Sequence, residues 1–222
     1  MRVFVINAYE DRKEKYDEDE RYEIFPAVWW EDVTEEQLQR HHFRWNAKIE
    51  LRKKIVACSL SHKRLLQKII NEDLKDVFII EDDVLIDFHR LDQLQDIKEF
   101  CYIGGNFGSP LLKDNLEFTK GGKKDSLRES LSKGINVIDP KEFRVGHTCG
   151  YYIPNRTVAQ DILTNIPHGK KDLAIDAEYI FLQKKGKITK FIYPAIAKLY
   201  IPDACKGFTY STYKLQDDQF FY

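Results

Sequence analysis

The sequence has few cysteines, and they are widely separated, at positions 58, 101, 149 and 205. They form no Cys-x-x-Cys pair, and no histidine lies at zinc-finger spacing from them. This spacing argues against a disulfide framework and against a zinc finger. It favours a reducing compartment, with the four thiols acting as inert core residues.

Long hydrophobic runs are also missing. The first apolar run, residues 3–6, is followed by Asn7 and the charged segment 10–13. Four apolar residues are too few for a signal peptide or a membrane span. We therefore expect a cytoplasmic protein without a transmembrane segment.

Neither sign of charge dominates. The chain carries 35 Lys and Arg against 36 Asp and Glu, a formal net charge of -1. Without a field of one sign, the whole protein does not attract nucleic acid, and we expect no nucleic-acid partner. With 222 residues, 43% hydrophobic and 13% aromatic, the chain is long and apolar enough to form a single α/β domain.

The strongest local pattern is the apolar run 77–80, which leads directly into Glu81, Asp82 and Asp83. Four consecutive β-favouring residues predict a central strand buried on both faces. Ligands of open α/β sheets bind beyond the carboxyl ends of such strands. Adjacent carboxylates repel one another unless a cation lies among them, and oxygen ligands favour Mg²⁺ or Mn²⁺. The pattern therefore indicates a metal-dependent enzyme acting on a nucleotide or phosphate substrate.

Strands and helices are predicted to alternate along the chain, as in an α/β fold. Thr34 and Gln37 have capping-box spacing, and Asn155 has the position of a helix cap. Strands are predicted at 2–7, 22–28, 77–80, 101–103, 149–153 and 191–193, helices at 34–43, 59–71, 91–100, 156–166 and 177–184, and a glycine-rich turn near a ligand at 104–108.

Two polar features have a structural and a functional interpretation. Ser59, Ser61 and His62 fall in the first turn of the predicted helix 59–71, either as a cap with solvated neighbours or as contacts to a phosphate or ribose. Asp176 stands where a helix cap belongs, and it could instead be a carboxylate that accepts a proton from a sugar hydroxyl.

Several segments, in this order, resemble glycosyltransferase family 25, the lipooligosaccharide and collagen galactosyltransferases with their viral relatives. They are Val5-Ile6-Asn7 with Arg12, Phe25-Pro26-Ala27, Ala57-Cys58-Ser59-Leu60-Ser61-His62, Ile79-Ile80-Glu81-Asp82-Asp83, Gly150-Tyr151-Tyr152-Ile153 and Ile175-Asp176. The likeness covers most of the chain and is most specific between Cys58 and Asp83. Ala57 stands where the family usually has glycine, and Ala8-Tyr9 where it has Leu and a polar residue.

The resemblance implies a GT-A fold, a single-domain α/β/α sandwich around a mostly parallel sheet. In such a fold the donor half would span about residues 1–110 and the acceptor half about 111–222. The implied reaction is inverting transfer of a hexose or pentose from a UDP-sugar to a hydroxyl of a glycan or glycoprotein acceptor. Glu81, Asp82 and Asp83 would form the DxD-type motif, with Asp83 and Glu81 on Mn²⁺ or Mg²⁺.

The remaining roles are also implied by the resemblance. The candidate base is Asp176, with Asp203 and Glu178 as alternatives. A third metal ligand could be His147 or Asp203. The expected donor contacts are Ile6, Asn7, Arg12, Ser61, His62 and Asp82.

Two other functions fit the acidic strand end. A metal-dependent phosphohydrolase or nuclease also uses clustered acids, although it normally needs a second motif of acids or histidines, and none is evident. A sugar-nucleotide-binding module that has lost catalysis is the non-enzymatic alternative, for which three adjacent acids have little use.

Overall fold

The computed structural model describes residues 1–41, 48–108, 131–140, 144–166 and 174–199, with residues 106–108, 147–148 and 198–199 described by their backbone only. Asp203 and Cys205 lie outside the described residues, and so does the side chain of His147.

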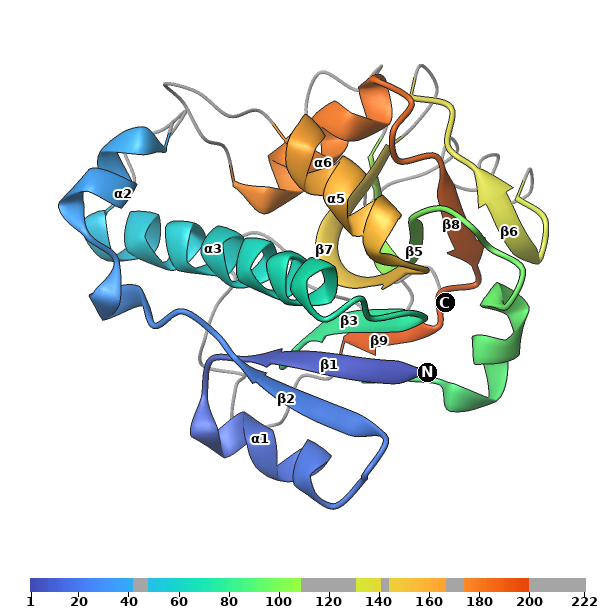
Figure 1. The fold of residues 1–222 in the computed structure, drawn as a ribbon, viewed down its shortest axis with the longest axis horizontal. Helices are drawn as coiled ribbons and strands as arrows, with labels where there is room; N and C mark the ends of the chain where they lie inside the picture. The colour runs from blue at the N-terminus through green and yellow to red at the C-terminus, as the bar shows by residue number, and fades with distance from the viewer. Residues whose placement is uncertain (42–47, 109–130, 141–143, 167–173, 200–222) are drawn as a thin grey trace, which may run out of the picture.

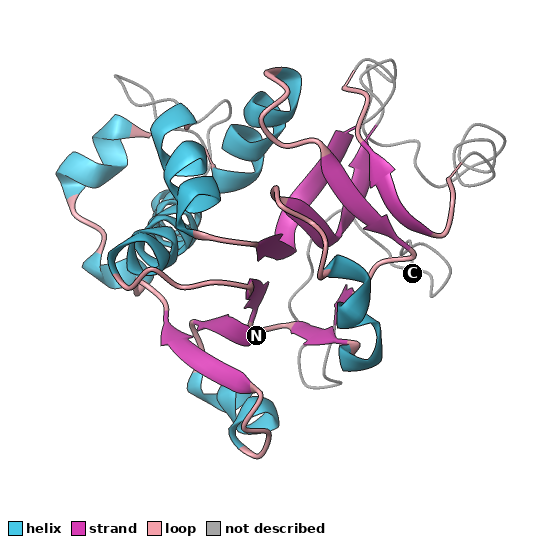
Figure 2. Ribbon diagram, turned by 45° about the vertical axis from the view of Figure 1, so that its right-hand side comes forward, coloured by secondary structure: helices cyan, strands magenta, loops and turns pink. Residues whose placement is uncertain are grey.

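A seven-stranded sheet forms the centre of the molecule, in the order β2-β1-β3-β7-β5-β8-β6 (Figures 1 and 2). Five strands run in one direction, and β7 and β6 run in the other. The bounds are β1 (Arg2–Asn7), β2 (Tyr22–Pro26), β3 (Val77–Glu81), β5 (Cys101–Gly108), β6 (Gly134–Val137), β7 (Arg144–Ile153) and β8 (Lys190–Tyr193). The neighbouring strands β2, β1 and β3 are parallel, so their carboxyl ends meet at one edge of the sheet.

Helices cover one face of this sheet. They are α3 (Ile49–Asn71), α5 (Arg156–Asn165) and α6 (Ile175–Lys184), which lie together above the strands in Figure 1. Phe4 and Ile6 of β1 point into the core beneath them, because alternate side chains of a strand face opposite sides.

The other face is covered by α1 (Glu10–Asp17), the 3₁₀ helix η2 (Phe88–Leu94) and a two-stranded sheet of β4 (Val84–Ile86) and β9 (Ala197–Leu199). Val3 and Val5 point into this second core. With layers on both faces, the fold is an α/β/α sandwich consistent with the GT-A type, as the sequence predicted. No helix in the described ranges is long and apolar enough to cross a bilayer.

Both predicted helix caps are confirmed. Thr34 forms a capping box with Gln37 before α2 (Glu35–Arg40), and the Asn155 side chain accepts a hydrogen bond from the Val158 N–H before α5. The predicted cap at Asp176 is wrong, because Ala174 is the N-cap of α6 and Asp176 is the second helical residue.

Three predicted elements need correction. Helix α3 begins at Ile49, ten residues before Ser59, so Ser59, Ser61 and His62 lie in mid-helix and not in a first turn. The helix predicted over 91–100 is only the 3₁₀ helix η2, which ends at Leu94. Residues 104–108 continue strand β5 and do not turn.

The glycines of β5 and β7 make room for β9. A Cβ atom at Gly104 would lie 2.9 Å from the Ala197 Cβ, and one at Gly150 would lie 2.7 Å from it. Both distances are shorter than carbon atoms tolerate, so these glycines allow the close approach of another strand. They do not form the ligand turn that the sequence suggested.

Candidate active site

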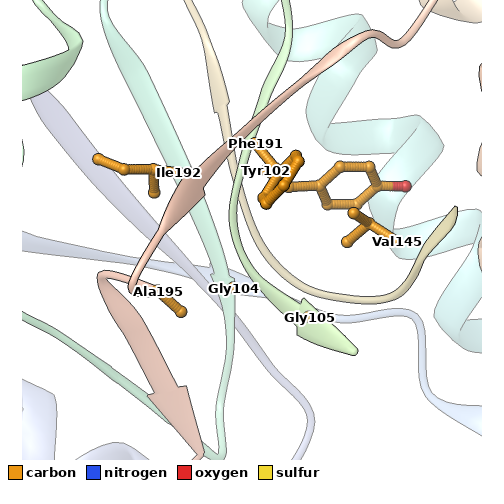
Figure 3. Close-up of a pocket in the computed structure, with 7 residues that line it drawn as sticks. All are labelled: Tyr102, Gly104, Gly105, Val145, Phe191, Ile192 and Ala195. Atoms are coloured by element: carbon orange, nitrogen blue, oxygen red, sulfur yellow. The ribbon is translucent and has the colours of Figure 1, made fainter. Parts of the chain in front are cut away.

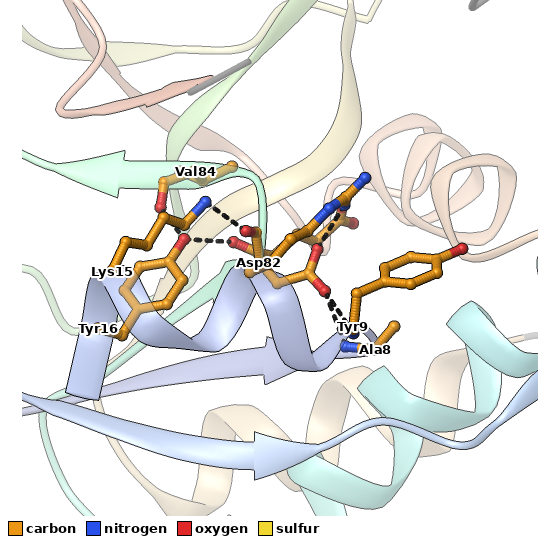
Figure 4. Close-up of polar contacts among 8 residues, drawn as sticks. Ala8, Tyr9, Lys15, Tyr16, Asp82 and Val84 are labelled. Atoms are coloured by element: carbon orange, nitrogen blue, oxygen red, sulfur yellow. Dashed lines mark hydrogen bonds and ion pairs between the residues drawn. The ribbon is translucent and has the colours of Figure 1, made fainter. Parts of the chain in front are cut away.

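The acidic segment Glu81–Asp83 forms the turn between β3 and β4, at the edge where β1, β2 and β3 end. Its three side chains have different surroundings. Asp82 is 5% exposed and points toward the start of α1. Its Oδ2 accepts hydrogen bonds from the backbone N–H groups of Ala8 and Tyr9, at 2.8 and 3.2 Å (Figure 4).

Arg12 completes this contact. Its guanidinium donates to Asp82 Oδ1 at 2.8 Å and lies 4.6 Å from the centre of the Tyr9 ring. The two side chains of the ion pair are largely buried, with exposed fractions of 20% for Arg12 and 6% for Asp82. Asp82 therefore holds the loop after β1 against the acidic turn, and its oxygens are occupied by protein donors.

Two further residues of α1 hold the backbone of the turn. Lys15 Nζ donates to the Asp82 carbonyl, and the Tyr16 hydroxyl donates to the Val84 carbonyl, each at 2.5 Å (Figure 4). Tyr16 is buried, and this burial raises the pKa of its phenol, so it stays a neutral donor. The turn is thus fixed by three side chains of one helix.

Asp83 differs from Asp82 in the surroundings of its carboxylate. Its Oδ1 is buried and has no hydrogen-bond partner among the described residues. Burial, followed by the neighbouring charges of Glu81 and Asp82, raises the pKa of Asp83 to about 7. Asn7, at the end of the adjacent β1, also has a buried and unpartnered Oδ1. Buried oxygen atoms without hydrogen-bond donors are suitable ligands for a hard divalent cation.

Glu81 is tied to α3 through His62. The His62 side chain is fully buried, with Nε2 3.3 Å from Glu81 Oε1 and Nδ1 2.8 Å from the Tyr151 hydroxyl oxygen. Because His62 belongs to α3 and Tyr151 to β7, Glu81 is connected to the helix-covered side of the sheet. The expected contact of His62 with the donor stays a prediction.

Asp176 belongs to the same site although it is distant in sequence. Burial raises the pKa of the Cys58 thiol, and the charges of Glu81, Asp176 and Asp83 raise it further. Burial and the same three carboxylates raise the pKa of Cys149. The geometry agrees, because the Cys58 sulfur lies within 4.8 Å of a Glu81 carboxylate oxygen and the next residue, Ser59, is hydrogen-bonded to the Ile175 N–H at the start of α6.

The start of α6 is positioned by α3. Ser59 Oγ accepts a hydrogen bond from the Ile175 backbone N–H at 3.0 Å and donates to the Ile55 carbonyl at 3.1 Å. Ser59 is fully buried. This contact, which sequence reasoning missed, fixes the residue that precedes Asp176.

Other expected site residues have structural contacts. Ser61 is buried, and its hydroxyl donates to the Ala57 carbonyl and accepts from the Val28 N–H. Glu178, an alternative base, is fully buried and paired with Lys63 at 2.9 Å. Ile6 is 6% exposed and packs in the core below the helices. The contacts of Ser61 and Ile6 with the donor, and the role of Glu178 as a base, stay predictions.

Cys58 differs from the expected inert core thiol. Cys101 and Cys149 are buried, whereas Cys58 is exposed. Its thiol nevertheless has enough protein around it for desolvation to raise its pKa. The Cys58 side chain therefore reaches solvent while other protein groups lie close to its sulfur atom.

An open cavity of about 450 Å³ adjoins the site at the carboxyl ends of β1 and β2. Its lining includes Asn7, Tyr9, Lys13 and Trp29, and the Tyr9 and Trp29 rings meet edge to face with centroids 5.9 Å apart. A second cavity, between β5 and β8 next to Tyr102 and Phe191 (Figure 3), measures only about 10 Å³. That space barely holds one water molecule, so the larger of these two cavities is the candidate ligand site among the described residues.

The model of glycosyltransferase family 25, described as an LPS biosynthesis protein, matches residues 1–177. The chain belongs to this family. No match to a curated protein was found. As in the resemblance drawn from the sequence, the match to family 25 includes Glu81–Asp83 and Asp176, the residues that the fold brings together.

Proposed function

We propose that this family-25 glycosyltransferase transfers a hexose or pentose from a UDP-sugar to a hydroxyl group of a glycan, with inversion and with Mn²⁺ or Mg²⁺. The observation that carries the proposal is the open cavity of about 450 Å³ at the carboxyl ends of β1 and β2, whose lining residues Ala8 and Tyr9 are hydrogen-bonded to Asp82 of the acidic turn. The site lies where open α/β sheets bind nucleotides, at the carboxyl ends of parallel strands.

The cavity suits the nucleoside. Tyr9 and Trp29 offer aromatic surfaces against which a base can pack, and Lys13 supplies a positive charge near a diphosphate. Asp82 and Arg12 hold the Tyr9 backbone and ring in place. Both residues therefore act on the donor by positioning Tyr9.

The metal-binding residues would be Asp83 and Glu81, with Asn7 beside them. Asp83 and Asn7 each present a buried oxygen without a hydrogen-bond partner among the described residues, and burial together with the charges of Glu81 and Asp82 raises the pKa of Asp83. A hard cation bound there would neutralise the charge of the departing diphosphate. His62 keeps the Glu81 carboxylate oriented toward this position.

Asp176 would act as the base. An inverting transfer needs a group that takes the proton of the acceptor hydroxyl on the side opposite the leaving diphosphate. Asp176 is the second residue of α6, which packs against β7 and α3, whereas the donor cavity lies at the ends of β1 and β2. The hydrogen bond between Ser59 and Ile175 limits movement of this helix end, which keeps the carboxylate in reach of a bound acceptor.

The test is thermal unfolding with a panel of nucleoside diphosphates and sugar nucleotides, with and without Mn²⁺, followed by a transfer assay. A ligand that binds only the folded protein raises its stability by mass action. UDP and one UDP-sugar should stabilise the chain only when Mn²⁺ is present. If no nucleotide raises the unfolding temperature, the proposal is wrong.

Two variants separate binding from chemistry. Asp83→Asn should lose the Mn²⁺-dependent response to UDP, and Asp176→Asn should keep that response while transfer falls by roughly 100-fold or more. Asp92→Asn, which changes an exposed aspartate of η2, is the matched control and should behave like the unmodified protein. Undiminished transfer activity in the Asp176→Asn variant would show that another residue is the base.

A further inference from the structure

Cys58, His62 and Glu81 form a cluster whose chemistry differs from that of the oxygen ligands at Asp83. Their possible ligand atoms, the Cys58 sulfur, a His62 ring nitrogen and a Glu81 carboxylate oxygen, all lie within 4.8 Å of one another. Cys58 and His62 are four residues apart on α3, so they lie on the same face of that helix. Glu81 reaches them from the end of β3.

We propose that Cys58, His62 and Glu81 bind a borderline-soft divalent cation such as Zn²⁺, with one coordination position left open. Thiolate and imidazole ligands favour Zn²⁺, whereas Mg²⁺ and Mn²⁺ prefer oxygen ligands. The site goes beyond the glycosyl transfer proposed above, and binding of Zn²⁺ does not depend on that activity.

The distances suit tetrahedral coordination after a small adjustment. Two ligands bound at about 2.0–2.1 Å in a tetrahedron lie roughly 3.3 Å apart. His62 Nε2 and Glu81 Oε1 already have that separation, 3.3 Å. A sulfur bound at about 2.3 Å should lie roughly 3.5 Å from the other ligands. The ligand atoms now lie within 4.8 Å of one another, so the sulfur has to approach the other two by roughly 1.3 Å at most.

His62 is oriented for this role by a neighbouring phenol. Its Nδ1 lies 2.8 Å from the Tyr151 hydroxyl, and both side chains are fully buried. In the metal-binding tautomer the ring proton is on Nδ1, and the Nδ1–H group donates a hydrogen bond to the Tyr151 hydroxyl oxygen. The lone pair of Nε2 is then available to the metal ion. Metal-binding histidines commonly have such a partner on the second ring nitrogen.

The surroundings favour a cation and give it access. Cys58 is exposed, so an ion can reach the cluster from solvent. The charges of Asp176, Asp83 and Asp82 act on the Cys58 thiol in addition to that of Glu81. These carboxylates disfavour a bare thiolate and attract a divalent ion. Binding therefore releases the thiol proton to solvent as the metal–sulfur bond forms.

The first experiment is a titration of the reduced, full-length protein with Co²⁺, a spectroscopic substitute for Zn²⁺. We expect one equivalent to give a sulfur-to-metal charge-transfer band and the strong visible bands of a tetrahedral ion, both removed by added Zn²⁺. Cys58→Ser should lose the charge-transfer band and weaken Zn²⁺ binding by roughly 100-fold or more. Cys101→Ala, which changes a buried thiol, should keep the band.

Two further measurements test the geometry. Zn²⁺ should protect Cys58 from alkylation by iodoacetamide, with the buried Cys101 and Cys149 as internal controls that stay unmodified. Tyr151→Phe should keep the charge-transfer band but lower Zn²⁺ affinity by about 10–100-fold, because the orientation of His62 is lost. Alkylation of Cys58 at an unchanged rate, or Co²⁺ binding without a sulfur band, would overturn the proposal.

Discussion

Three consecutive acidic residues have different physical roles, which depend on their neighbours. Asp82 is neutralised by Arg12 and by two backbone donors, so it holds two loops together. Asp83 has a buried oxygen that no group in the described part of the chain reaches by a hydrogen bond. The sequence predicted that this segment forms a charged strand end, but it did not predict which of the three side chains is paired with protein donors. The pairing of Asp82 depends on the loop after β1, which is distant in sequence.

The raised pKa of Asp83 predicts that the free energy of unfolding of the metal-free protein depends on pH. Its value is 3.8 for a free aspartate and about 7 here, so between those pH values the folded chain keeps a proton that the unfolded chain has released. Stability therefore falls as the pH rises through this range, by about 4 kcal/mol at most. Asp83→Asn should raise the free energy of unfolding at pH 8 and have a smaller effect at pH 5.

Urea denaturation in the presence of a chelator, at both pH values, measures this difference. Asp92→Asn serves again as the control, since an exposed carboxylate gives no such contrast. Equal effects of Asp83→Asn at pH 5 and pH 8 would show that Asp83 is not held in an unfavourable charged state.

Helix caps could be predicted from local sequence, whereas helix lengths could not. Thr34 with Gln37, and Asn155 with Val158, satisfy donors within a few residues. The helix predicted over residues 91–100 is instead the short 3₁₀ helix η2, which ends at Leu94. In the structure Leu91 and Leu94 pack below the sheet and Phe100 packs above it, so the chain has to leave the helix to reach the other face.

The contact between α3 and α6 gives a prediction at the scale of elements. Ser59→Ala removes the acceptor of the Ile175 N–H and leaves a buried donor without a partner. We expect a loss of about 1–2 kcal/mol in the free energy of unfolding. If α6 places Asp176, transfer should fall while Mn²⁺-dependent binding of UDP stays intact. Thr157→Ala, an exposed change on α5, is the control. A variant with reduced UDP binding would show that Ser59 supports the donor side instead.

At the scale of the whole molecule, the sheet order explains why the site was only partly predictable. Parallel β2, β1 and β3 bring Asn7 and Glu81–Asp83 to one edge, which the strand patterns indicated. Asp176 and Cys58 reach this edge from helices, through contacts such as the one between Ser59 and Ile175. These contacts join segments about a hundred residues apart, and no local pattern in the sequence encodes them.

The shared residue Glu81 links the two proposed metal sites, and this coupling is testable on the intact protein. A carboxylate that binds Zn²⁺ together with Cys58 and His62 is less available to a hard cation beside Asp83. Zn²⁺ should therefore weaken Mn²⁺-dependent binding of UDP, and by thermodynamic reciprocity UDP with Mn²⁺ should weaken Zn²⁺ binding by the same factor. Calorimetric titration of UDP at fixed Mn²⁺, with and without Zn²⁺, measures that factor.

The variant Cys58→Ser decides the origin of this effect. It removes a ligand of the softer site and leaves Glu81, Asp83 and Asn7 in place, so Zn²⁺ should no longer interfere with UDP binding. Inhibition by Zn²⁺ that persists in Cys58→Ser would mean that Zn²⁺ simply replaces Mn²⁺ on the oxygen ligands. Inhibition that disappears would mean that the exposed Cys58 thiol lets a second metal ion control the donor site.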